Sequence, residues 1–283
     1  MDHKGGFGAR LAAAVADRGP LCVGIDPHPG LLDAWGMPDD AGGLERFALT
    51  AVDALAARIA VLKPQSAFFE RHGSRGIAVL ERVLSRAREA GALVLLDVKR
   101  GDIGSTMTAY AQAYLDDAAP LAADAVTLSP YLGTGALAPA VELAERTGRG
   151  IFVLALTSNP EGAVVQRAQT RGGPRDGCSV AQQVVDTVAA ANSGASPQGH
   201  VGIVAGATVE TTGLDLGALN GPVLAPGVGA QGAAVTDLPR LFGPAVRSVL
   251  PATARDVLRH GPDQAALADA ALRVRDQAAL VIR

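Results

Sequence analysis

The feature that most constrains the fold of this chain is a set of eight short apolar runs, each the length of a buried strand. Alanine-rich stretches with apolar residues at helical spacing lie between runs, such as GIAVLERVLSRAREAG and TMTAYAQAYLDDAAPLA. Strands that alternate with helices pair in parallel through right-handed crossovers. Eight such units in 283 residues predict an α/β protein with a (β/α)8 TIM barrel. The runs lie at residues 21–25, 59–63, 92–99, 124–129, 151–157, 200–206, 222–227 and 245–250.

An open, doubly wound sheet is the alternative, because hydrophobic periodicity alone does not distinguish it from a barrel. Polar residues follow nearly all the runs, as expected at the C-terminal face of a barrel, and this favours the barrel. No linker or low-complexity tract divides the chain, so we expect one domain over residues 1–283. The exception to the short connections is a loop at about residues 158–178, whose length and composition are typical of active-site lids.

The composition argues against several classes of function. The formal net charge is -3 and aromatic residues make up 4% of the chain, which does not fit a nucleic-acid-binding protein. Cys22 and Cys178 are too few for a disulfide framework or a four-cysteine zinc site, and the histidines have no metal-ligand spacing. The chain has neither a signal-type start nor an apolar run of about 20 residues. We therefore expect a cytoplasmic protein without membrane contact and without a metal site.

The stretch LLDVKRGDIGST carries Asp97, Lys99 and Asp102 at and beyond the end of an apolar run. Residues two apart on a strand share one face, so Asp97 and Lys99 should point together over the barrel mouth. Lys63 ends the preceding run and Asp26 follows the first run, so charges of alternating sign would line one rim. Lysine occurs only at positions 4, 63 and 99. Two of these positions end apolar runs, which suggests a need for an ammonium group that can exchange a proton.

Each of these residues also has a structural explanation. Asp97 and Lys99 could form an ion pair that only supports the fold, and Asp102 could be a helix N-cap. A buried pair seldom stabilises a fold more than apolar packing would, however, and several ionisable groups on one rim favour a catalytic site.

A glycine-rich segment, PVLAPGVGAQGA, includes the seventh run. Gly227, Gly229 and Gly232 match a dinucleotide-binding pattern, but too little chain follows to complete a nucleotide domain. In a barrel, the backbone N–H groups of such glycines can instead approach a phosphate. Arg255 would hold that phosphate bidentately; the alternative, a solvated helix start, is less favourable for a cation. The sequence therefore predicts a phosphorylated small-molecule ligand.

Five motifs in this order, VGIDPHP, KPQSAFFE, DVKRGDIGST, LTSNP and PGVGAQG, resemble those of the orotidine 5′-phosphate decarboxylase family. The resemblance extends from about the first run to the last, and its most specific part is the pattern D-x-K-x-x-D-I-x-x-T. The KPQSAFFE and TSNP forms, with the long loop, are most similar to the longer bacterial subfamily. Ser158 and Asn159 in TSNP suit hydrogen bonding to a polar heterocycle, although turn chemistry around Pro160 also explains them.

The resemblance implies a homodimeric barrel that converts orotidine 5′-phosphate to UMP and carbon dioxide in de novo pyrimidine biosynthesis, without a cofactor or metal. Lys99 would then protonate pyrimidine C6, and Asp97 would lie against the departing carboxylate. Lys63 and Asp26 would bind ribose hydroxyls. The other implied site residues are Ser158 for the pyrimidine, Pro226, Gln231, Ala254 and Arg255 for the phosphate side, and Asp102, Ile103 and Thr106 for the partner subunit's site.

One position departs from the family pattern, because members often have glycine where Ala254 precedes Arg255. Two other functions also fit these residues. A magnesium-dependent sugar-phosphate decarboxylase or aldolase of the 3-keto-gulonate phosphate type shares D-x-K-x-x-D, but Lys63 places a cation where a metal enzyme would need a ligand. A catalytically silent nucleotide-binding sensor is the second alternative, and the intact Lys99 argues against it.

Overall fold

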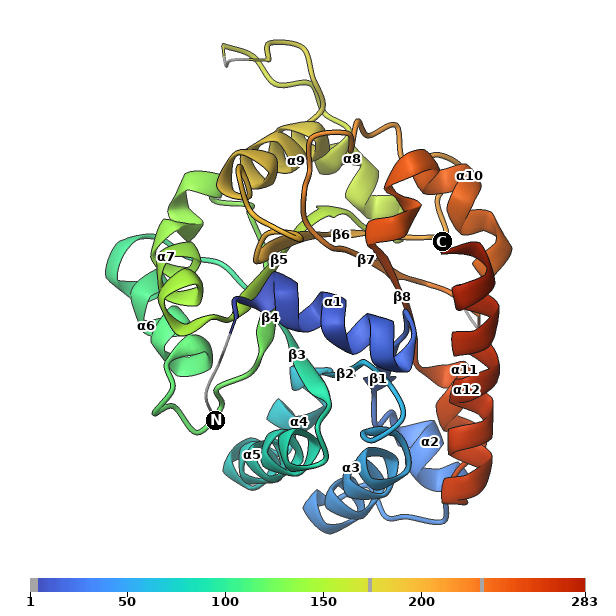
Figure 1. Ribbon diagram of the computed structural model, residues 1–283. Coiled ribbons are helices and arrows are strands. Elements are labelled where there is room, and N and C mark those ends of the chain that lie inside the picture. The colour runs from blue at the N-terminus through green and yellow to red at the C-terminus, as the bar shows by residue number, and fades with distance from the viewer. Residues whose placement is uncertain (1–4, 173–174, 230–231, 283) are drawn as a thin grey trace.

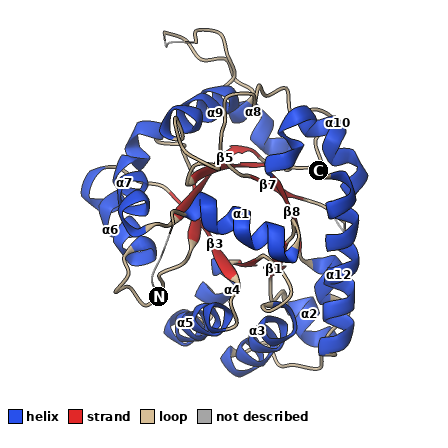
Figure 2. Cartoon of the chain, in the orientation of Figure 1, coloured by secondary structure: helices blue, strands red, loops and turns tan. Residues whose placement is uncertain are grey.

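The computed structural model describes residues 5–172, 175–229 and 232–282. Its eight strands pair in parallel in sequence order, and the last closes onto the first (Figures 1 and 2). The predicted (β/α)8 TIM barrel is thus confirmed and the open sheet is excluded. The strands are β1 (Cys22–Ile25), β2 (Val61–Pro64), β3 (Leu93–Arg100), β4 (Ala125–Leu128), β5 (Gly150–Leu156), β6 (Val201–Ala205), β7 (Val223–Pro226) and β8 (Val249–Thr253).

Helices surround the barrel, and most strands are followed by one or two of them (Figure 2). The connection between β6 and β7 is different, because residues 206–222 are all described and contain no helix. None of the helices in the described ranges is both long and apolar enough to span a membrane. They are α1 (Phe7–Arg18), α2 (Pro29–Ala34), α3 (Ala41–Leu55), α4 (Ser66–Glu70), α5 (Gly73–Glu89), α6 (Gly104–Leu115), α7 (Ala138–Thr147), α8 (Ala163–Gln166), α9 (Val180–Ala191), α10 (Leu238–Phe242), α11 (Arg255–Leu258) and α12 (Gln264–Val281).

Helix α1 lies across the N-terminal end of the barrel (Figure 1). Its residues Phe7 and Leu11 pack with inward-facing strand residues, including Cys22 and Phe152, in a buried cluster separate from the larger one between barrel and helices. Phe7 meets Phe152 edge to face, with ring centroids 6.0 Å apart. A Cβ at Gly150 would lie 2.3 Å from the Phe7 ring, so glycine is required for this closure. The closed end leaves the C-terminal mouth as the place for a site.

The structure corrects the predicted position of the eighth strand. Residues Gly243–Ser248 form a 3-10 helix, and β8 runs from Val249 to Thr253. The predicted run at residues 245–250 ends before Pro251, a residue type that is uncommon within strands. Pro251 lies within β8 and pairs with Ala225 of β7. The strand ends at Thr253, immediately before Ala254 and Arg255.

Two other segments differ from the expected pattern. The predicted helix at TMTAYAQAYLDDAAPLA ends at Leu115, before the acidic and proline-containing part of that stretch. The long connection after β5 contains a short 3-10 helix, Pro160–Gly162, and then α8. Its outer part is joined by an antiparallel bridge between Gln169 and Ser179 and projects away from the helices (Figure 1).

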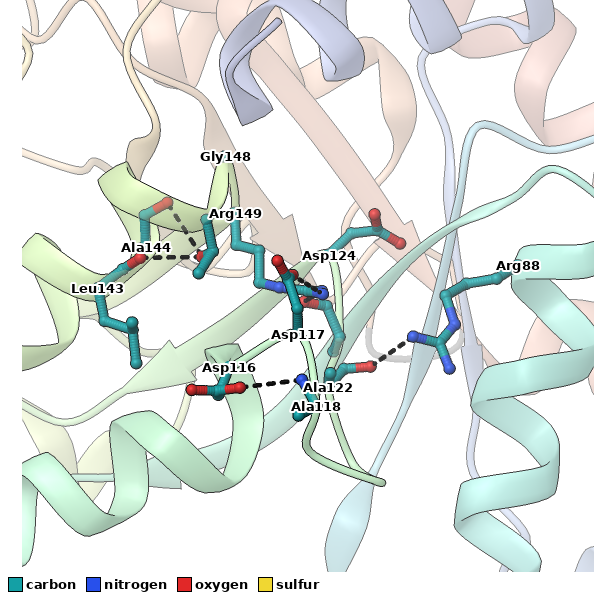
Figure 3. A network of polar contacts seen from close by, with 12 residues as sticks. Arg88, Asp116, Asp117, Ala118, Ala122, Asp124, Leu143, Ala144, Gly148 and Arg149 are labelled. Atoms are coloured by element: carbon teal, nitrogen blue, oxygen red, sulfur yellow. Dashed lines mark hydrogen bonds and ion pairs between the residues drawn. The ribbon is translucent and has the colours of Figure 1, made fainter. Parts of the chain in front are cut away.

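A network of charged residues holds the N-terminal end together, and Figure 3 shows the part of it that contains Asp117, Asp124 and Arg149. Arg10 of α1 donates to the Asp124 carboxylate and, at 2.9 Å, to the Gly148 carbonyl. The second Asp124 oxygen accepts the Val94 N–H at 2.9 Å. The buried Arg149 donates to the Ala123 carbonyl and to Asp117. We call Arg10, Asp117, Asp124 and Arg149 the base network; it joins α1 to the starts of β3, β4 and β5.

Candidate active site

A cavity of about 290 Å³ opens at the C-terminal ends of the strands. A smaller cavity that shares lining residues with it is lined by Arg255, Gly227 and His28. The predicted residue Gln231 lies outside the described residues. Seven predicted site residues line the larger cavity: Asp26, Lys63, Asp97, Lys99, Ser158, Pro226 and Ala254.

Asp97 lies at the centre of the charged group, and only 6% of it is exposed. Its Oδ1 accepts from Lys99 Nζ at 2.6 Å and from Thr127 Oγ1 at 2.7 Å. Its Oδ2 accepts from Lys63 Nζ at 2.9 Å. In the amide orientation that satisfies both neighbours, Gln65 donates to Oδ2 at 2.6 Å and accepts from Lys99 Nζ at 3.2 Å. Each oxygen of this carboxylate therefore accepts from two donors.

The local course of β3 differs from a regular strand. Leu96 pairs with Val126 and Arg100 pairs with Leu128, so three residues of β3 oppose Thr127 alone. Within this bulge Lys99 has φ 46°, in the left-handed region that residues with a Cβ seldom occupy. Asp97 and Lys99 do point to the same place, but through a bulge rather than through simple two-residue alternation. An outlier of this kind is typical of functional sites.

The charges of the site stabilise one another. Burial opposes ionisation of Asp97, but the ammonium groups of Lys63 and Lys99 outweigh it and hold the pKa of this carboxyl well below its usual range. Burial likewise opposes the charge on Lys63, yet Asp97 and Asp26 together raise its pKa above the usual value. An ionised Asp97 and a charged Lys63 are therefore the stable forms across the neutral range.

Asp26 differs from Asp97 in having an unused oxygen. Its Oδ1 is buried and has no hydrogen-bond partner among the described residues. Burial raises the pKa of this carboxyl, an effect that Lys63 opposes and Asp97 increases. A buried acceptor without a partner is costly, and a ligand hydroxyl would satisfy it. Cys22 of β1 is also buried, and burial raises the pKa of its thiol to about 12. This cysteine is therefore a protonated core residue.

The end of β8 explains how alanine replaces the glycine of the family pattern. Ala254 has φ −135° and ψ −68°, so its φ is negative and the left-handed conformation that favours glycine is not required here. A Cβ at Gly24 would lie 2.8 Å from the Ala254 methyl carbon and 3.2 Å from the Asp26 carboxylate oxygens. The Ala254 methyl group therefore occupies space that Gly24 leaves open.

The loop after β3 lies apart from the cavity. Asp102 accepts a hydrogen bond from the Ile103 N–H at 2.8 Å, and neither residue lines the cavity, nor does Thr106. The N-cap of α6 is Ile103, so the alternative explanation of Asp102 as a helix N-cap is wrong. Ile103 is 62% exposed and Thr106 is also exposed. Within this chain, Asp102 makes no described contact with Lys99.

The end of β5 holds Ser158 against the cavity through its neighbours. The Gln166 side chain of α8 accepts from the Thr157 N–H and donates to the Thr157 hydroxyl, at 2.8 and 2.7 Å. The Thr157 hydroxyl in turn donates to Asn159 at 2.7 Å. Ser158 and Asn159 line the cavity, and no described hydrogen bond uses the Ser158 hydroxyl.

Two residues in contact with Asp97 were missed in the sequence. Gln65 stands in the motif KPQSAFFE directly after β2, and Thr127 is a polar residue within the apolar run DAVTLS. A polar side chain on a buried strand was the available signal for Thr127, which is 1% exposed. Across the described residues, no three His, Cys, Asp or Glu side chains are grouped so that they could hold a metal ion.

Comparisons with known proteins agree with this geometry. The model of the orotidine 5′-phosphate decarboxylase / HUMPS family matches residues 19–270. Orotidine 5′-phosphate decarboxylases of Salinispora arenicola and Streptomyces coelicolor are 65% and 61% identical, over 95% and 94% of this chain and 95% of each relative. A Streptomyces avermitilis crystal structure, provisionally described as the same enzyme, superposes with a TM-score of 0.95 at 56% identity, over all of this chain and 98% of the other.

Proposed function

Because the chain belongs to the orotidine 5′-phosphate decarboxylase / HUMPS family, we propose that its site converts orotidine 5′-phosphate to UMP, with Lys99 delivering the proton to C6. The chain is a carboxy-lyase, since its relatives at 61–65% identity are named orotidine 5′-phosphate decarboxylases. The observation that supports Lys99 is the 2.6 Å contact between its Nζ and Asp97 Oδ1 at the wall of the cavity. In this proposal no cofactor or metal takes part.

Decarboxylation at C6 leaves an sp2 carbanion that the pyrimidine ring cannot delocalise as an enolate. The enzyme must therefore stabilise negative charge at the carbon where it develops. The Lys99 ammonium is a fixed cation for this purpose and also the proton source that ends the reaction. Its side chain is 45% exposed toward the cavity, whereas the Lys63 side chain is 9% exposed. We assign the reactive role to Lys99 and the supporting charge to Lys63.

Asp97 would face the carboxylate that departs. Its pKa lies well below the usual range because Lys63 and Lys99 outweigh the effect of burial, so it stays ionised and repels a second carboxylate nearby. Repulsion raises the energy of the bound substrate and ends when carbon dioxide leaves. The two lysines keep Asp97 charged throughout.

The rest of the substrate would be held away from the reacting carbon. The unpartnered Asp26 oxygen is suited to a ribose hydroxyl, and Lys63 lies beside it. Ser158 would bind the pyrimidine. Pro226, Gln231, Ala254 and Arg255 would enclose the phosphate, with Arg255 on the smaller cavity. Binding energy from the phosphate would then organise the distant reacting groups.

We also propose a homodimer in which Asp102, Ile103 and Thr106 enter the partner's site. Their position outside this chain's own cavity supports the idea. Ile103 is 62% exposed, and Tyr131 and Leu132 of the next connection are 78% and 52% exposed. Large exposed apolar side chains on two successive connections at the C-terminal side of the barrel favour burial against a second copy. The partner's Asp102 would place a second carboxylate near Lys99.

The direct test is incubation with orotidine 5′-phosphate while the loss of ultraviolet absorbance is followed as UMP forms. We expect turnover that survives a chelator. Strict dependence on magnesium would support the sugar-phosphate enzyme instead, and binding without turnover would support a nucleotide sensor.

The shared site has a separate test. Lys99→Ala and Asp102→Ala chains are each inactive alone in this proposal, but a hybrid dimer has one intact site. An equal mixture should regain about one quarter of wild-type activity, because about half the dimers are hybrids with one of two sites intact. A mixture that stays inactive after proven subunit exchange would remove the shared site and leave decarboxylation by Lys99 standing.

A further inference from the structure

Thr127 is placed between the two groups that the proposed reaction needs most. It lies on β4, is 1% exposed, and faces the bulge of β3 that contains Asp97 and Lys99. Its hydroxyl donates to Asp97 Oδ1 at 2.7 Å. The same hydroxyl accepts the backbone N–H of Lys99 at 2.9 Å.

The bulge explains why a side chain is needed here. Three residues of β3 oppose a single residue of β4, so the regular ladder cannot supply a carbonyl for every N–H. Regular pairing resumes at Ser129, whose N–H donates to the Arg100 carbonyl at 2.7 Å. Between these points the Thr127 hydroxyl satisfies the Lys99 N–H in place of a backbone carbonyl. This N–H is partly buried, so leaving it without a partner would be costly.

The bonding pattern also fixes the direction of the hydroxyl proton. A hydroxyl has one proton to donate, and Lys99 N–H occupies an acceptor site, so the proton must point to Asp97. Asp97 Oδ1 is also the atom that Lys99 Nζ contacts at 2.6 Å. The backbone and the side-chain tip of Lys99 are therefore both positioned relative to one hydroxyl group.

From this geometry we infer that Thr127 is a positioning residue, whose hydroxyl holds Lys99 in its left-handed backbone conformation and keeps Asp97 oriented beside it. It acts through those two residues. The inference rests on the proposed decarboxylation, since it concerns the efficiency of Lys99 as proton donor. A displacement of about 1 Å at a reacting group can cost about 100-fold in rate.

Two variants separate the hydroxyl from the packing. Thr127→Val keeps the shape and volume but removes both hydrogen bonds, whereas Thr127→Ser keeps the hydroxyl and removes only a methyl group. Thr127 borders the cavity, but its hydroxyl is bonded to Asp97 and to the Lys99 N–H and not left for a ligand. We therefore expect Thr127→Val to lower kcat by about 100-fold, with KM and the Kd for UMP changed by less than about threefold. Thr127→Ser should retain kcat within about fivefold.

A second readout does not depend on turnover. Hydrogen exchange at the Lys99 amide, followed by mass spectrometry of overlapping peptides, should be faster in Thr127→Val than in wild type and near wild type in Thr127→Ser. If Thr127→Val does not fold, Thr127→Ala takes its place in both measurements.

The outcomes are distinct. The inference is overturned if kcat of Thr127→Val stays within about threefold of wild type, if both variants lose activity equally, or if Lys99 exchange is unchanged. Loss of kcat together with faster Lys99 exchange in the valine variant alone supports it. A wild-type protein without decarboxylase activity would refute the proposed function, and the exchange measurement would still decide whether Thr127 holds Lys99.

Discussion

Two buried carboxylates on neighbouring strands, Asp97 and Asp124, serve opposite ends of the same barrel. They are similarly buried, at 6% and 5% exposure. Asp97 at the C-terminal mouth pairs with Lys63 and Lys99 and borders a cavity. Asp124 at the N-terminal end pairs with Arg10 and caps the Val94 N–H within the base network. The two acids differ in their partners and in their access to a ligand, not in their burial.

The choice of cation explains the difference. A guanidinium is planar, permanently charged and suited to several fixed hydrogen bonds, as Arg10 makes with Asp124 and the Gly148 carbonyl. A lysine ammonium is compact and can give up a proton. Of the three lysines in the chain, two contact Asp97, and Lys4 lies outside the described residues. Arginine is therefore the partner of the structural acid Asp124, and lysine is the partner of Asp97 at the proposed chemical end.

The largest effect should come from exchanging the cations. Lys99→Ala should lower kcat/KM by at least about 10⁴-fold, because both the proton donor and a charge at the carbanion are lost. Lys99→Arg should not restore turnover, because arginine does not release a proton near neutral pH. Both variants should still bind UMP, measured by calorimetry.

The matched control is a cation exchange at the N-terminal end of the barrel, in the base network. Arg10→Lys should keep kcat/KM within about threefold while lowering the free energy of unfolding by about 1 kcal/mol, as the bond to the Gly148 carbonyl is lost. Near-normal decarboxylation by either Lys99 variant would remove the distinction between the two ends.

Neutralising Asp124 should lower the free energy of unfolding without changing kcat/KM. Asp124→Asn keeps the shape but leaves the Arg10 charge without its partner, and we expect a loss of about 3 kcal/mol in the free energy of unfolding. The midpoint of thermal unfolding should fall by about 5 °C. In the folded protein, kcat/KM should stay within about threefold of wild type. A large loss of activity at unchanged stability would show instead that the base network reaches the site.

The sequence predicts the barrel because its main determinant, the alternation of strand-length runs with helical stretches, is visible without tertiary contacts. It also predicts that Asp97 and Lys99 lie together, since strand side chains alternate. A hydrophobic pattern does not show that β3 has two more residues than β4 between the pairs Leu96–Val126 and Arg100–Leu128. The bulge and the left-handed conformation of Lys99 were therefore not predicted. Thr127 and Gln65 could not be assigned to Asp97 because their contacts depend on that bulge and on the register between strands.

The base network was missed for a related reason. Asp124 stands at the start of an apolar run and Arg149 just before another, where charged residues normally mark the surface end of a strand. Only the placement of α1 across the barrel brings Arg10, over 100 residues away, to Asp124. The eighth strand was misplaced because the apolar run at residues 245–250 ends before Pro251, whereas the strand that closes the barrel includes Pro251 and continues to Thr253.

Asp26→Asn should change the free energy of unfolding in the opposite direction from Asp124→Asn. Since its pKa is raised, mainly by burial, ionised Asp26 opposes folding at every pH above its folded pKa, and this cost disappears as the pH falls below the unfolded value of about 4. Asp26→Asn should therefore stabilise the protein at pH 7, and the gain should vanish at about pH 4. UMP should bind more weakly. Thermal unfolding at both pH values checks the sign, and destabilisation at pH 7 would contradict it.

The smallest effects should appear where Ala254 meets Gly24. Gly24→Ala places a methyl carbon 2.8 Å from that of Ala254 and 3.2 Å from the Asp26 oxygens, so the end of β8 and Asp26 must both shift. We expect kcat/KM to fall about tenfold, mostly through KM, since the contacts affected are those of ribose and phosphate rather than of Lys99. Ala254→Gly alone should change kcat/KM by less than about threefold.

The double variant decides whether the two positions compensate each other. Ala254→Gly removes the closer contact, so Gly24→Ala with Ala254→Gly should recover part of the lost kcat/KM, while the contact with Asp26 remains. The matched change at the other end is Gly150→Ala, which meets the Phe7 ring and should lower the midpoint of thermal unfolding without raising KM. Strictly additive losses at Gly24 and Ala254 would mean that alanine here is independent of Gly24, because a shared steric contact must appear as coupling between the two substitutions.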